Sequence, residues 1–289
     1  MPLAWTTRGR LVSLERPFIF GIVNVTPDSF SDGGRFFSVD AAVAHAARLV
    51  AEGADGLDVG GESTRPQGAR PVAADEERER IVPVLRELRR RFPDTVISVD
   101  TVKSEVATAA LDVGADVVND VSGFRLDPRM GEICASEGCG VILMHSRGTV
   151  SEMGTYLHAE YEGRATDAVV RELSESVAGA RRAGVADGAI VVDPGVGFAK
   201  RGAHSVEVLH DLPRLVALGF PVLVGASRKR FIGELTGVKE PADRVNGTVG
   251  AHVVALTRGA RLFRVHDVRP HREALDVAHA VLAGAEREP

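Results

Sequence analysis

The sequence is short of cysteine, of excess positive charge and of long apolar runs, and each shortage excludes a class of protein. Cys134 and Cys139 are the only cysteines among 289 residues, so we expect reduced, packed thiols in a cytoplasmic protein and no disulfide scaffold. The net charge of −5 argues against nucleic-acid binding. No apolar run approaches membrane-spanning length, and residues 1–10 contain no apolar signal-peptide region. These absences predict a soluble globular protein with no membrane partner.

Short apolar runs recur along the chain in a fixed order. A helical pattern ends in a small-residue turn, an apolar run follows, and that run ends in a polar residue. Counting the first strand, eight such runs begin at about residues 18, 56, 96, 117, 141, 189, 221 and 262. Runs rich in β-branched residues and without polar alternation are typical of strands buried on both faces, as in a parallel sheet.

The segments between these runs have the periodicity of helices. Apolar residues recur at helical spacing at Ile81, Val84, Leu85 and Leu88, and again at Val169, Leu173 and Val177. Glycines at the expected helix ends, Gly53, Gly114, Gly184 and Gly219, fit the left-handed turn that closes many helices. Eight strands alternating with helices over about 270 residues predict an α/β fold, a (β/α)8 TIM barrel forming a single domain over residues 1–289. An open doubly wound sheet is the alternative, but no Gly-x-Gly-x-x-Gly follows the first strand.

Polar residues stand where the predicted strands end. TIM-barrel enzymes carry their sites at the carboxyl ends of the strands. Those ends hold Asn24, residues 62–65, Asp100, Asn119, His145, Asp193, Ser227, Arg228, Lys229, Arg264 and His266. A polar, glycine-rich loop, residues 24–34, also leaves the end of the first strand. We therefore expect carboxylates, carboxamides, cations and hydroxyls to face one mouth.

The residue types in this ring indicate what it could bind. Ser227, Arg228 and Lys229 stand at the expected start of a helix, where backbone N–H groups favour an anion. Arg264 and His266 add a second cationic pocket, which suits a substrate with two anionic groups. Buried Asp100, Asn119 and Asp193 would recognise a flat heterocycle with several N–H donors.

Several neighbouring residues have plainer interpretations. We expect Asp58 to be a hydrogen-bonded interior carboxylate and Asp120 to cap the loop that follows it. His145, after Met144, fits a core histidine and a pocket residue equally well. The arginines at 89–91 have the pattern of a solvated helix face.

Seven motifs in chain order resemble those of the dihydropteroate synthase family. They are NVTPDSFSDGG at 24–34, GGESTRP at 60–66, SVDT at 98–101, NDVSG at 119–123, DPGVGF at 193–198, SRKRF at 227–231 and RVHD at 264–267. Each follows or ends a predicted strand, and the resemblance covers essentially the whole chain. It implies condensation of 6-hydroxymethyl-7,8-dihydropterin diphosphate with p-aminobenzoate in folate biosynthesis, with Mg²⁺ as cofactor and a homodimer as the assembly.

The resemblance also implies roles for individual residues. Asp100, Lys229 and Asn24 would be catalytic, and Asn24 would lie close to Mg²⁺. The pterin would contact Asp100, Asn119, Met144, Asp193 and Lys229, and the diphosphate would contact Asn24, Arg264 and His266. p-Aminobenzoate would lie among Thr64, Arg65, Pro66, Phe198, Lys229 and Ser227. The chain departs from the family pattern at Ser146, at Ala199, and at Gln67, which resembles an insertion.

Two other functions are compatible with part of the pattern. A methyltetrahydrofolate–corrinoid methyltransferase barrel would explain Asp100, Asn119 and Asp193, but not the motif at 227–229 or the first loop. A pterin-binding paralogue without catalysis would need neither Asn24 nor the loop that contains Thr64 and Arg65.

Overall fold

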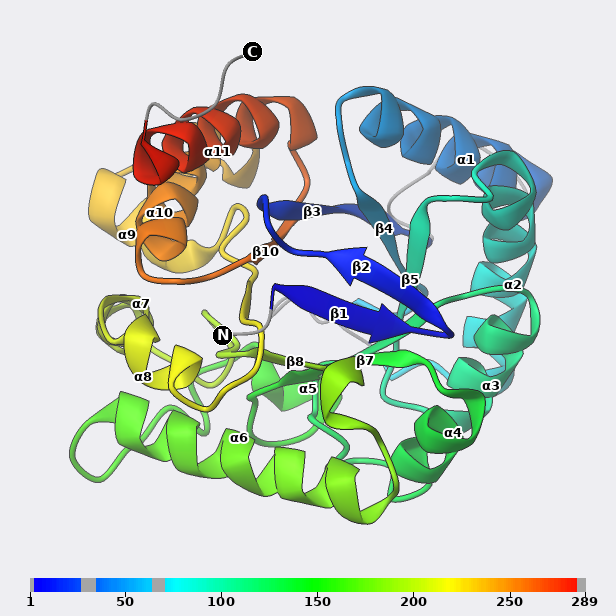
Figure 1. The fold of residues 1–289 in the computed structure, drawn as a ribbon, viewed down its shortest axis with the longest axis horizontal. Coiled ribbons are helices and arrows are strands. Elements are labelled where there is room, and N and C mark those ends of the chain that lie inside the picture. Colours follow the sequence, from blue (N-terminus) through cyan, green and yellow to red (C-terminus); the bar gives the residue numbers. More distant parts are fainter. Residues whose placement is uncertain (1–2, 27–34, 64–70, 285–289) are drawn as a thin grey trace.

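The computed structural model describes residues 3–26, 35–63 and 71–284 and forms a closed parallel barrel. Eight strands lie in the order β8-β7-β6-β5-β4-β3-β10-β9. A parallel bridge between Val192 and Val222 joins the two ends of this sheet. The strands are β3 (Phe18–Asn24), β4 (Gly56–Gly60), β5 (Val96–Asp100), β6 (Val117–Asp120), β7 (Gly140–Met144), β8 (Ile190–Asp193), β9 (Leu223–Val224) and β10 (Leu262–Val265). The predicted (β/α)8 barrel is confirmed (Figure 1).

Helices surround the barrel (Figure 1). The longer ones are α1 (Arg35–Ala51), α2 (Ala74–Arg91), α3 (Ser104–Asp112), α4 (Met130–Glu137), α6 (Ala165–Arg182), α7 (Gly202–His210), α10 (Val245–Thr257) and α11 (Val268–Ala283). The shorter ones are α5 (Val150–Met153), α8 (Leu212–Val216), α9 (Arg230–Thr236) and the 3₁₀ turns η2 (Asp187–Ala189) and η3 (Pro241–Arg244). No helix in the described ranges is both long and apolar enough to span a membrane.

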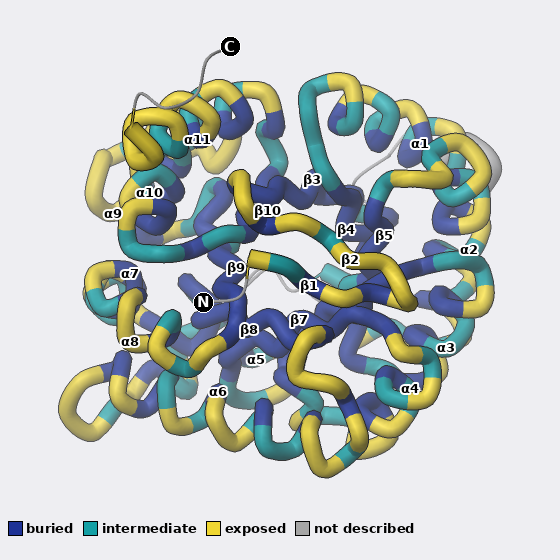
Figure 2. The backbone as a smooth tube through the Cα atoms, in the orientation of Figure 1, coloured by how far each residue is buried: buried dark blue, intermediate teal, exposed yellow. Residues whose placement is uncertain are grey.

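The main core lies between the strands and the helix ring. Both predicted apolar stripes, on α2 and α6, are buried there as expected. Figure 2 shows the barrel strands almost wholly buried and the outward helix faces exposed. Cys134 and Cys139 are free thiols in this core, as predicted. The four predicted helix-end glycines have φ of 100°, 105°, 95° and 89°, so their left-handed conformation is also confirmed.

One surface prediction was wrong in part. Arg90 and Arg91 bond Glu87 on the surface of α2, as expected of a solvated face. Arg89 instead turns toward the next repeat, where it donates to Asp116 Oδ2 at 2.5 Å and to the Gly114 carbonyl at 3.0 Å. A guanidinium with five donors can satisfy backbone carbonyls at an α–β junction, which a charge-run pattern does not reveal.

A hairpin that the sequence patterns did not predict closes the floor of the barrel. Strands β1 (Ala4–Thr7) and β2 (Arg10–Ser13) pair across Arg8 and Gly9, whose φ values are 40° and 77°. Positive φ at both turn residues is the geometry of a tight hairpin turn. Trp5 is fully buried among the residues inside the barrel, and its indole N–H donates to the Ala189 carbonyl at 2.7 Å. The hairpin therefore seals the end of the barrel opposite the strand ends that carry the polar motifs (Figure 1).

Replacing Trp5 by Ala should destabilise the fold by about 3–5 kcal/mol, because it opens a cavity and removes a buried hydrogen bond. Urea unfolding followed by circular dichroism would measure this change. Leu11→Ala, on the same hairpin but 75% exposed, is the control and should cost less than about 0.5 kcal/mol. Equal losses of unfolding free energy in the two variants would contradict the role of buried Trp5 in closing this end of the barrel.

Candidate active site

The register of the parallel strands brings polar side chains to one end of the barrel. Asn24, which ends β3, pairs with Gly60 of β4, and Gly60 pairs with Asp100, which ends β5. Asp100 pairs in turn with Asn119 of β6. Because neighbouring parallel strands end at similar heights, side chains more than ninety residues apart in the sequence lie at one mouth.

Arg264 connects two carboxylates across this mouth. Its Nε donates to Asp58 Oδ2 at 2.5 Å, and its Nη2 donates to Asp100 Oδ2 at 2.8 Å. Asp58 is 1% exposed, which agrees with its predicted interior role. A guanidinium is the cation best suited to bridge two acceptors, because its donors are fixed in a planar fork.

Asp58 also orients Asn119. The Asn119 Nδ2 group donates to Asp58 Oδ2 at 3.2 Å, in a buried contact. An ionised carboxylate only accepts hydrogen bonds, so it selects the amide nitrogen and turns the Asn119 carbonyl oxygen the other way. Asn119 therefore presents an acceptor beside the carboxylate of Asp100.

Asp193 completes the acidic side of the mouth. It pairs in register with Met144 at the end of β7, and its Oδ1 accepts the Gly195 backbone N–H at 2.7 Å. Met144 packs with Phe198, Val102 and other apolar side chains in a small cluster. A patch of apolar surface thus lies next to the acceptors, an arrangement that suits a flat heterocycle with polar edges.

Burial shifts the proton equilibria of these acids. It raises the pKa of Asp100 to about 7, with Arg264 acting against the rise and Asp58 adding to it. It also raises the pKa of Asp193 to about 6, although the Gly195 N–H lowers it. Carboxyl groups with a pKa near 7 are typical of a site that binds a ligand with N–H donors or positive charge.

Lys229 supplies a cation near these acids, since it follows β9, the barrel neighbour of the strand that carries Asp193. It directly precedes α9, as predicted, and its ammonium lies 3.7 Å from the centre of the Phe198 ring. Burial and the charge of Arg264 lower the pKa of Lys229 to about 8, with Asp193 and Asp100 acting against the fall. The contact with the ring face is a cation–π interaction that places both side chains at one point of the mouth.

The predicted cationic cluster around Ser227 is only partly available to an anion. Arg228, with φ of 58°, donates two hydrogen bonds to Asp267, at 2.9 and 2.6 Å, so its charge is already paired. Ser227 Oγ and His266 Nδ1 lie 2.9 Å apart, and Ser227 Oγ also accepts the His266 backbone N–H at 3.2 Å. The structure therefore brings together Ser227 and His266 from two different strand ends.

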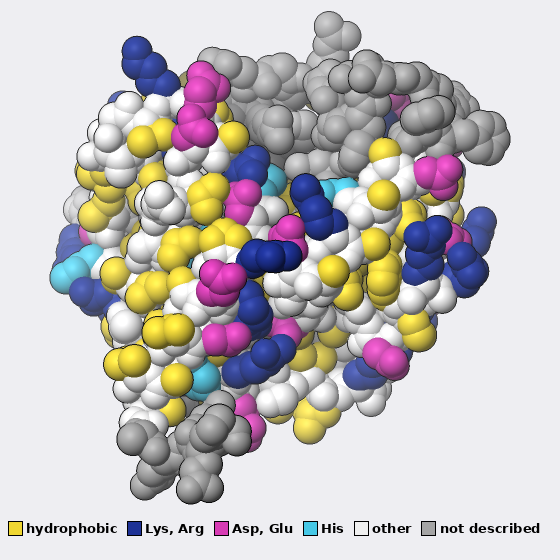
Figure 3. Space-filling model, turned by 90° about the horizontal axis from the view of Figure 1, so that it is seen from above, with side chains coloured by type: hydrophobic (Ala, Val, Ile, Leu, Met, Phe, Trp, Pro, Cys, Tyr) yellow, Lys and Arg dark blue, Asp and Glu magenta, His cyan; other side chains and the backbone are white. Residues whose placement is uncertain are grey.

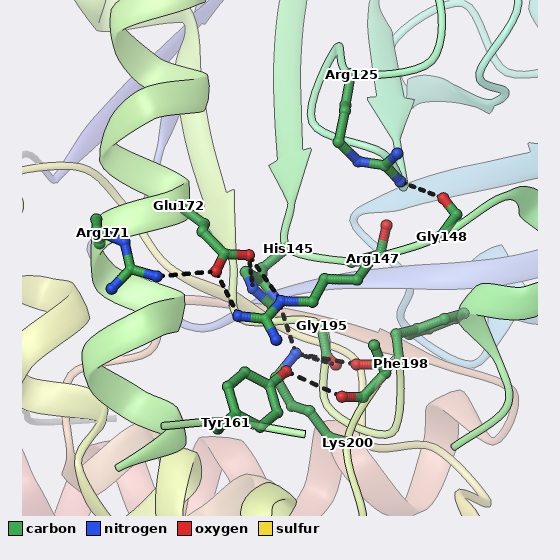
Figure 4. A network of polar contacts seen from close by, with 12 residues as sticks. Arg125, His145, Arg147, Gly148, Tyr161, Arg171, Glu172, Gly195, Phe198 and Lys200 are labelled. Atoms are coloured by element: carbon green, nitrogen blue, oxygen red, sulfur yellow. Dashed lines mark hydrogen bonds and ion pairs between the residues drawn. The ribbon is translucent and has the colours of Figure 1, made fainter. Parts of the chain in front are cut away.

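The structure gives hydrogen-bond partners to Asp120, predicted to cap a loop, and to His145, for which a core and a pocket position were both expected. Asp120 accepts the backbone N–H groups of Ser122 and Phe124, so it caps its loop as predicted. His145 is buried and lies between Glu172 of α6 and Lys200, which places it in a polar network beside the mouth (Figure 4). Sequence reasoning did not find Lys200 or Glu172, because neither belongs to a strand-end motif.

Three predicted site residues, Thr64, Arg65 and Pro66, lie outside the described residues, as does Gln67. Among the described residues, no three His, Cys, Asp or Glu side chains form a group that could hold a metal ion.

Known proteins resemble this chain over nearly its full length. The model of a family described as pterin binding enzyme matches residues 20–266. Dihydropteroate synthase of Mycobacterium leprae is 45% identical over 94% of this chain and 95% of its own. The mitochondrial folate synthesis bifunctional protein of Arabidopsis thaliana is 40% identical over 93% of this chain, which spans about half of that protein's length. The structure of Xanthomonas albilineans dihydropteroate synthase with 4-aminobenzoic acid superposes with a TM-score of 0.90, at 46% identity, covering 98% of this chain and 99% of that one.

The fold and the ring of strand-end side chains are those of a pterin-binding barrel, and the chain belongs to the pterin binding enzyme family. Within that family its relatives include dihydropteroate synthases, as the seven motifs indicated.

Replacing Arg264 by Met should destabilise the protein more at high pH than at low pH. Removing the guanidinium takes away the charge that holds the pKa of Asp100 down to about 7, so that pKa rises further above its unfolded value of about 3.9. Between these two values the native state retains a proton that the unfolded state lacks. The free energy of unfolding therefore falls as pH rises, by up to about 1.4 kcal/mol per pH unit, and in the variant the fall continues beyond pH 7.

Urea unfolding at pH 5.5 and pH 8.5 would test this expectation. Arg86→Met, at an exposed position of α2, is the control and should show no pH-dependent difference from wild type. A destabilisation by Arg264→Met that is the same at both pH values would contradict the proposed role of Arg264.

Proposed function

We propose that this chain catalyses dihydropteroate synthesis, in which 6-hydroxymethyl-7,8-dihydropterin diphosphate and p-aminobenzoate give 7,8-dihydropteroate and pyrophosphate. The observation that carries the proposal is the set of oriented acceptors, Asp100, the Asn119 oxygen and Asp193, together with a half-buried cation at Lys229. The N–H edge of a pterin matches such acceptors, and Lys229 would donate to an acceptor on the ring. A ligand without those N–H groups would leave the acceptors unpaired and would be rejected.

The reaction exchanges one bond at the pterin methylene carbon. The carbon–oxygen bond to the diphosphate breaks and its electron pair leaves with pyrophosphate. The amine of p-aminobenzoate then forms a carbon–nitrogen bond and loses a proton. We propose a dissociative course in which positive charge develops on the pterin methylene, since the electron-rich ring can delocalise it. Asp100, which ends β5 at the mouth and accepts a hydrogen bond from Arg264, would stabilise that charge.

The leaving group requires positive charge at the same mouth. We propose that Arg264, His266 and Asn24 bind the diphosphate. Arg264 uses two of its five N–H donors on Asp58 and Asp100, which leaves three that could reach phosphate oxygens. His266 follows Arg264 by two residues, and its Nδ1 lies 2.9 Å from Ser227 Oγ.

We further propose that Mg²⁺ accompanies the diphosphate and neutralises its developing charge. Mg²⁺ commonly takes one or two protein ligands and completes its shell with water and substrate phosphates. A single carboxamide at Asn24, with no cluster of acids among the described residues, fits such a substrate-borne ion better than a permanent protein cage.

p-Aminobenzoate would occupy the opposite side of the mouth. We propose that its ring packs near Phe198 and that its carboxylate meets Ser227, with Lys229 adding positive charge. Thr64, Arg65 and Pro66 would complete this half-site. Water must be kept from a methylene cation, because water would capture it, and the two loops after β3 and β4 would exclude it.

Asp100→Asn should lower kcat/KM for the pterin substrate by about 100-fold or more, because the amide cannot supply negative charge to the developing cation. The assay measures pyrophosphate release and dihydropteroate formation, with and without p-aminobenzoate. In the wild type, kcat/KM should fall as pH drops below about 7, where Asp100 becomes protonated, and this limb should vanish in the variant.

Asp112→Asn, at an exposed position of α3, is the matched control and should behave as wild type. Tight pterin binding by the wild type without turnover would support a binding paralogue. Methyl transfer to a corrinoid would support the methyltransferase alternative. Either result would overturn the proposed synthase activity.

We also propose that the chain forms a homodimer through α10 and α11. Four apolar side chains there are 48–76% exposed: Val254, Val277, Val281 and Leu282. Figure 3 shows hydrophobic side chains gathered on the left of the upper face, where these helices lie. A contiguous exposed apolar patch is typical of a subunit interface.

Val277→Asp combined with Val281→Asp should convert the dimer to a monomer, because charges would be buried at the interface. Light scattering after gel filtration would measure the mass. Leu157→Asp, which is equally exposed outside these helices, is the control and should remain dimeric. A double variant that stays dimeric would show that this surface is not the dimer interface.

A cytoplasmic location is part of the same proposal. The two free, buried cysteines support it, since thiols persist in reducing compartments.

A further inference from the structure

A second polar network lies directly beside the mouth, and the reaction proposed above does not use it (Figure 4). Its centre is Lys200, which is 1% exposed. The Lys200 ammonium donates to His145 Nδ1 at 2.8 Å, to the Gly195 carbonyl at 3.1 Å and to the Phe198 carbonyl at 3.0 Å. A buried lysine is costly unless every donor is satisfied, and here three acceptors meet three donors.

The hydrogen bonds of His145 require Lys200 to be the donor. His145 Nε2 lies 3.0 Å from Glu172 Oε2, and Arg147 holds the Glu172 carboxylate from the other side with bonds of 3.0 and 2.5 Å. An ionised carboxylate only accepts, so Nε2 carries the hydrogen and Nδ1 of the neutral ring accepts. Burial and the charge of Lys200 lower the pKa of His145 to about 4, which agrees with a neutral imidazole.

The two backbone acceptors of Lys200 belong to a loop of unusual conformation. Gly195, Gly197 and Ala199 have φ of 64°, 79° and 47°, and a Cβ on Gly195 would lie 1.9 Å from the His145 carbonyl oxygen. A left-handed alanine is strained, so contacts from outside the loop must hold it. The Ala199 amide donates to Met153 at 2.7 Å, and the Ala199 carbonyl accepts from the Tyr161 hydroxyl at 2.9 Å.

This loop carries Phe198, whose ring lies under the Lys229 ammonium. We propose that Lys200 is a positioning residue for the aminobenzoate half-site: held by His145 and Glu172, it fixes the loop so that Phe198 and Lys229 keep their contact. The proposal rests on the function proposed above for that half-site. The pterin half-site depends less on Lys200, because its acceptors Asp100, Asn119 and Asp193 lie on strands β5, β6 and β8. Asp100 and Asn119 take their contacts from Arg264 and Asp58, whereas Asp193 also accepts the Gly195 N–H of the loop.

The charge of Lys200 depends on the groups around it. Burial lowers its pKa to about 7, with the carboxylates of Asp193 and Glu172 acting against the fall and the cations Arg147 and Lys229 adding to it. The three acceptors then favour the ammonium form, since a neutral amine could donate to only two of them.

Lys200→Met keeps most of the side-chain volume and removes all three donors. It should raise KM for p-aminobenzoate by about tenfold or more while changing KM for the pterin diphosphate by less than about threefold, because a displaced loop affects one half-site. Hydrogen exchange measured by mass spectrometry should show faster exchange over residues 195–200 in the free protein. A merely destabilised protein would instead exchange faster throughout.

Glu172→Gln provides a second variant at a more exposed position, 26% for the side chain. Its amide can donate to His145 Nε2, which permits the other tautomer and opposes Lys200. It should change both measurements in the same direction as Lys200→Met, by a smaller factor. Arg171→Ala removes a different, exposed contact of Glu172, at 3.3 Å, and should leave both measurements as in wild type.

Equal changes in the two KM values, or unchanged exchange over 195–200 in both variants, would overturn the positioning role. Should Lys200→Met fail to fold, Glu172→Gln decides by the same criteria. Should the wild type make no dihydropteroate, the proposed function fails, whereas the exchange comparison still tests whether Lys200 holds the loop.

Discussion

The mouth of this barrel depends on one guanidinium held between the buried carboxylate of Asp58 and the half-buried carboxylate of Asp100. Asp58 and Asp100 lie on adjacent strands, and without Arg264 their negative charges would repel each other with no cation between them. Removing one member of such an ion pair leaves an uncompensated charge, so Asp58, Asp100 and Arg264 each depend on the other two for stability. Asn119 is oriented through the same Asp58 oxygen. The most specific feature of the site, an outward amide oxygen, therefore follows from the electrostatics of its interior neighbour.

The strand-end groups differ in how they are fixed. Those on the sheet inherit their positions from the ladder of parallel strands and from each other. Those on loops are held by side chains from surrounding helices: Thr248 and His252 of α10 accept the Arg228 and Ala226 amides at 3.1 Å each. Lys200, which contacts α6 through His145 and Glu172, holds the loop after β8 by donating to the Gly195 and Phe198 carbonyls. The helix ring thus shapes half of the site as well as covering the sheet.

The barrel fold and the residues that lie at its mouth could be predicted, because both follow from short patterns in the sequence. Buried strands are continuous apolar runs, and the polar residue at the end of each run lies at the mouth in any parallel barrel. The hairpin that contains Trp5 was missed because two four-residue strands around Arg8-Gly9 have neither a long run nor a common turn pair. The pairing of Arg228 with Asp267 and the turn of Arg89 toward Asp116 were not predicted either, since charge patterns give no partner distant in sequence.

The division between strand-held and loop-held groups matches the chemistry proposed for the two substrates. Stabilising a developing cation requires charges that do not reorganise during the reaction, and Asp100, fixed by Arg264 on the sheet, satisfies that requirement. The second substrate must enter, find its orientation and leave as part of a larger product, which favours a half-site built on loops. Those loops still need a defined shape at the moment of attack. Hydrogen bonds from Lys200 to two loop carbonyls, backed by α6, supply that shape without placing another charge at the reacting carbon.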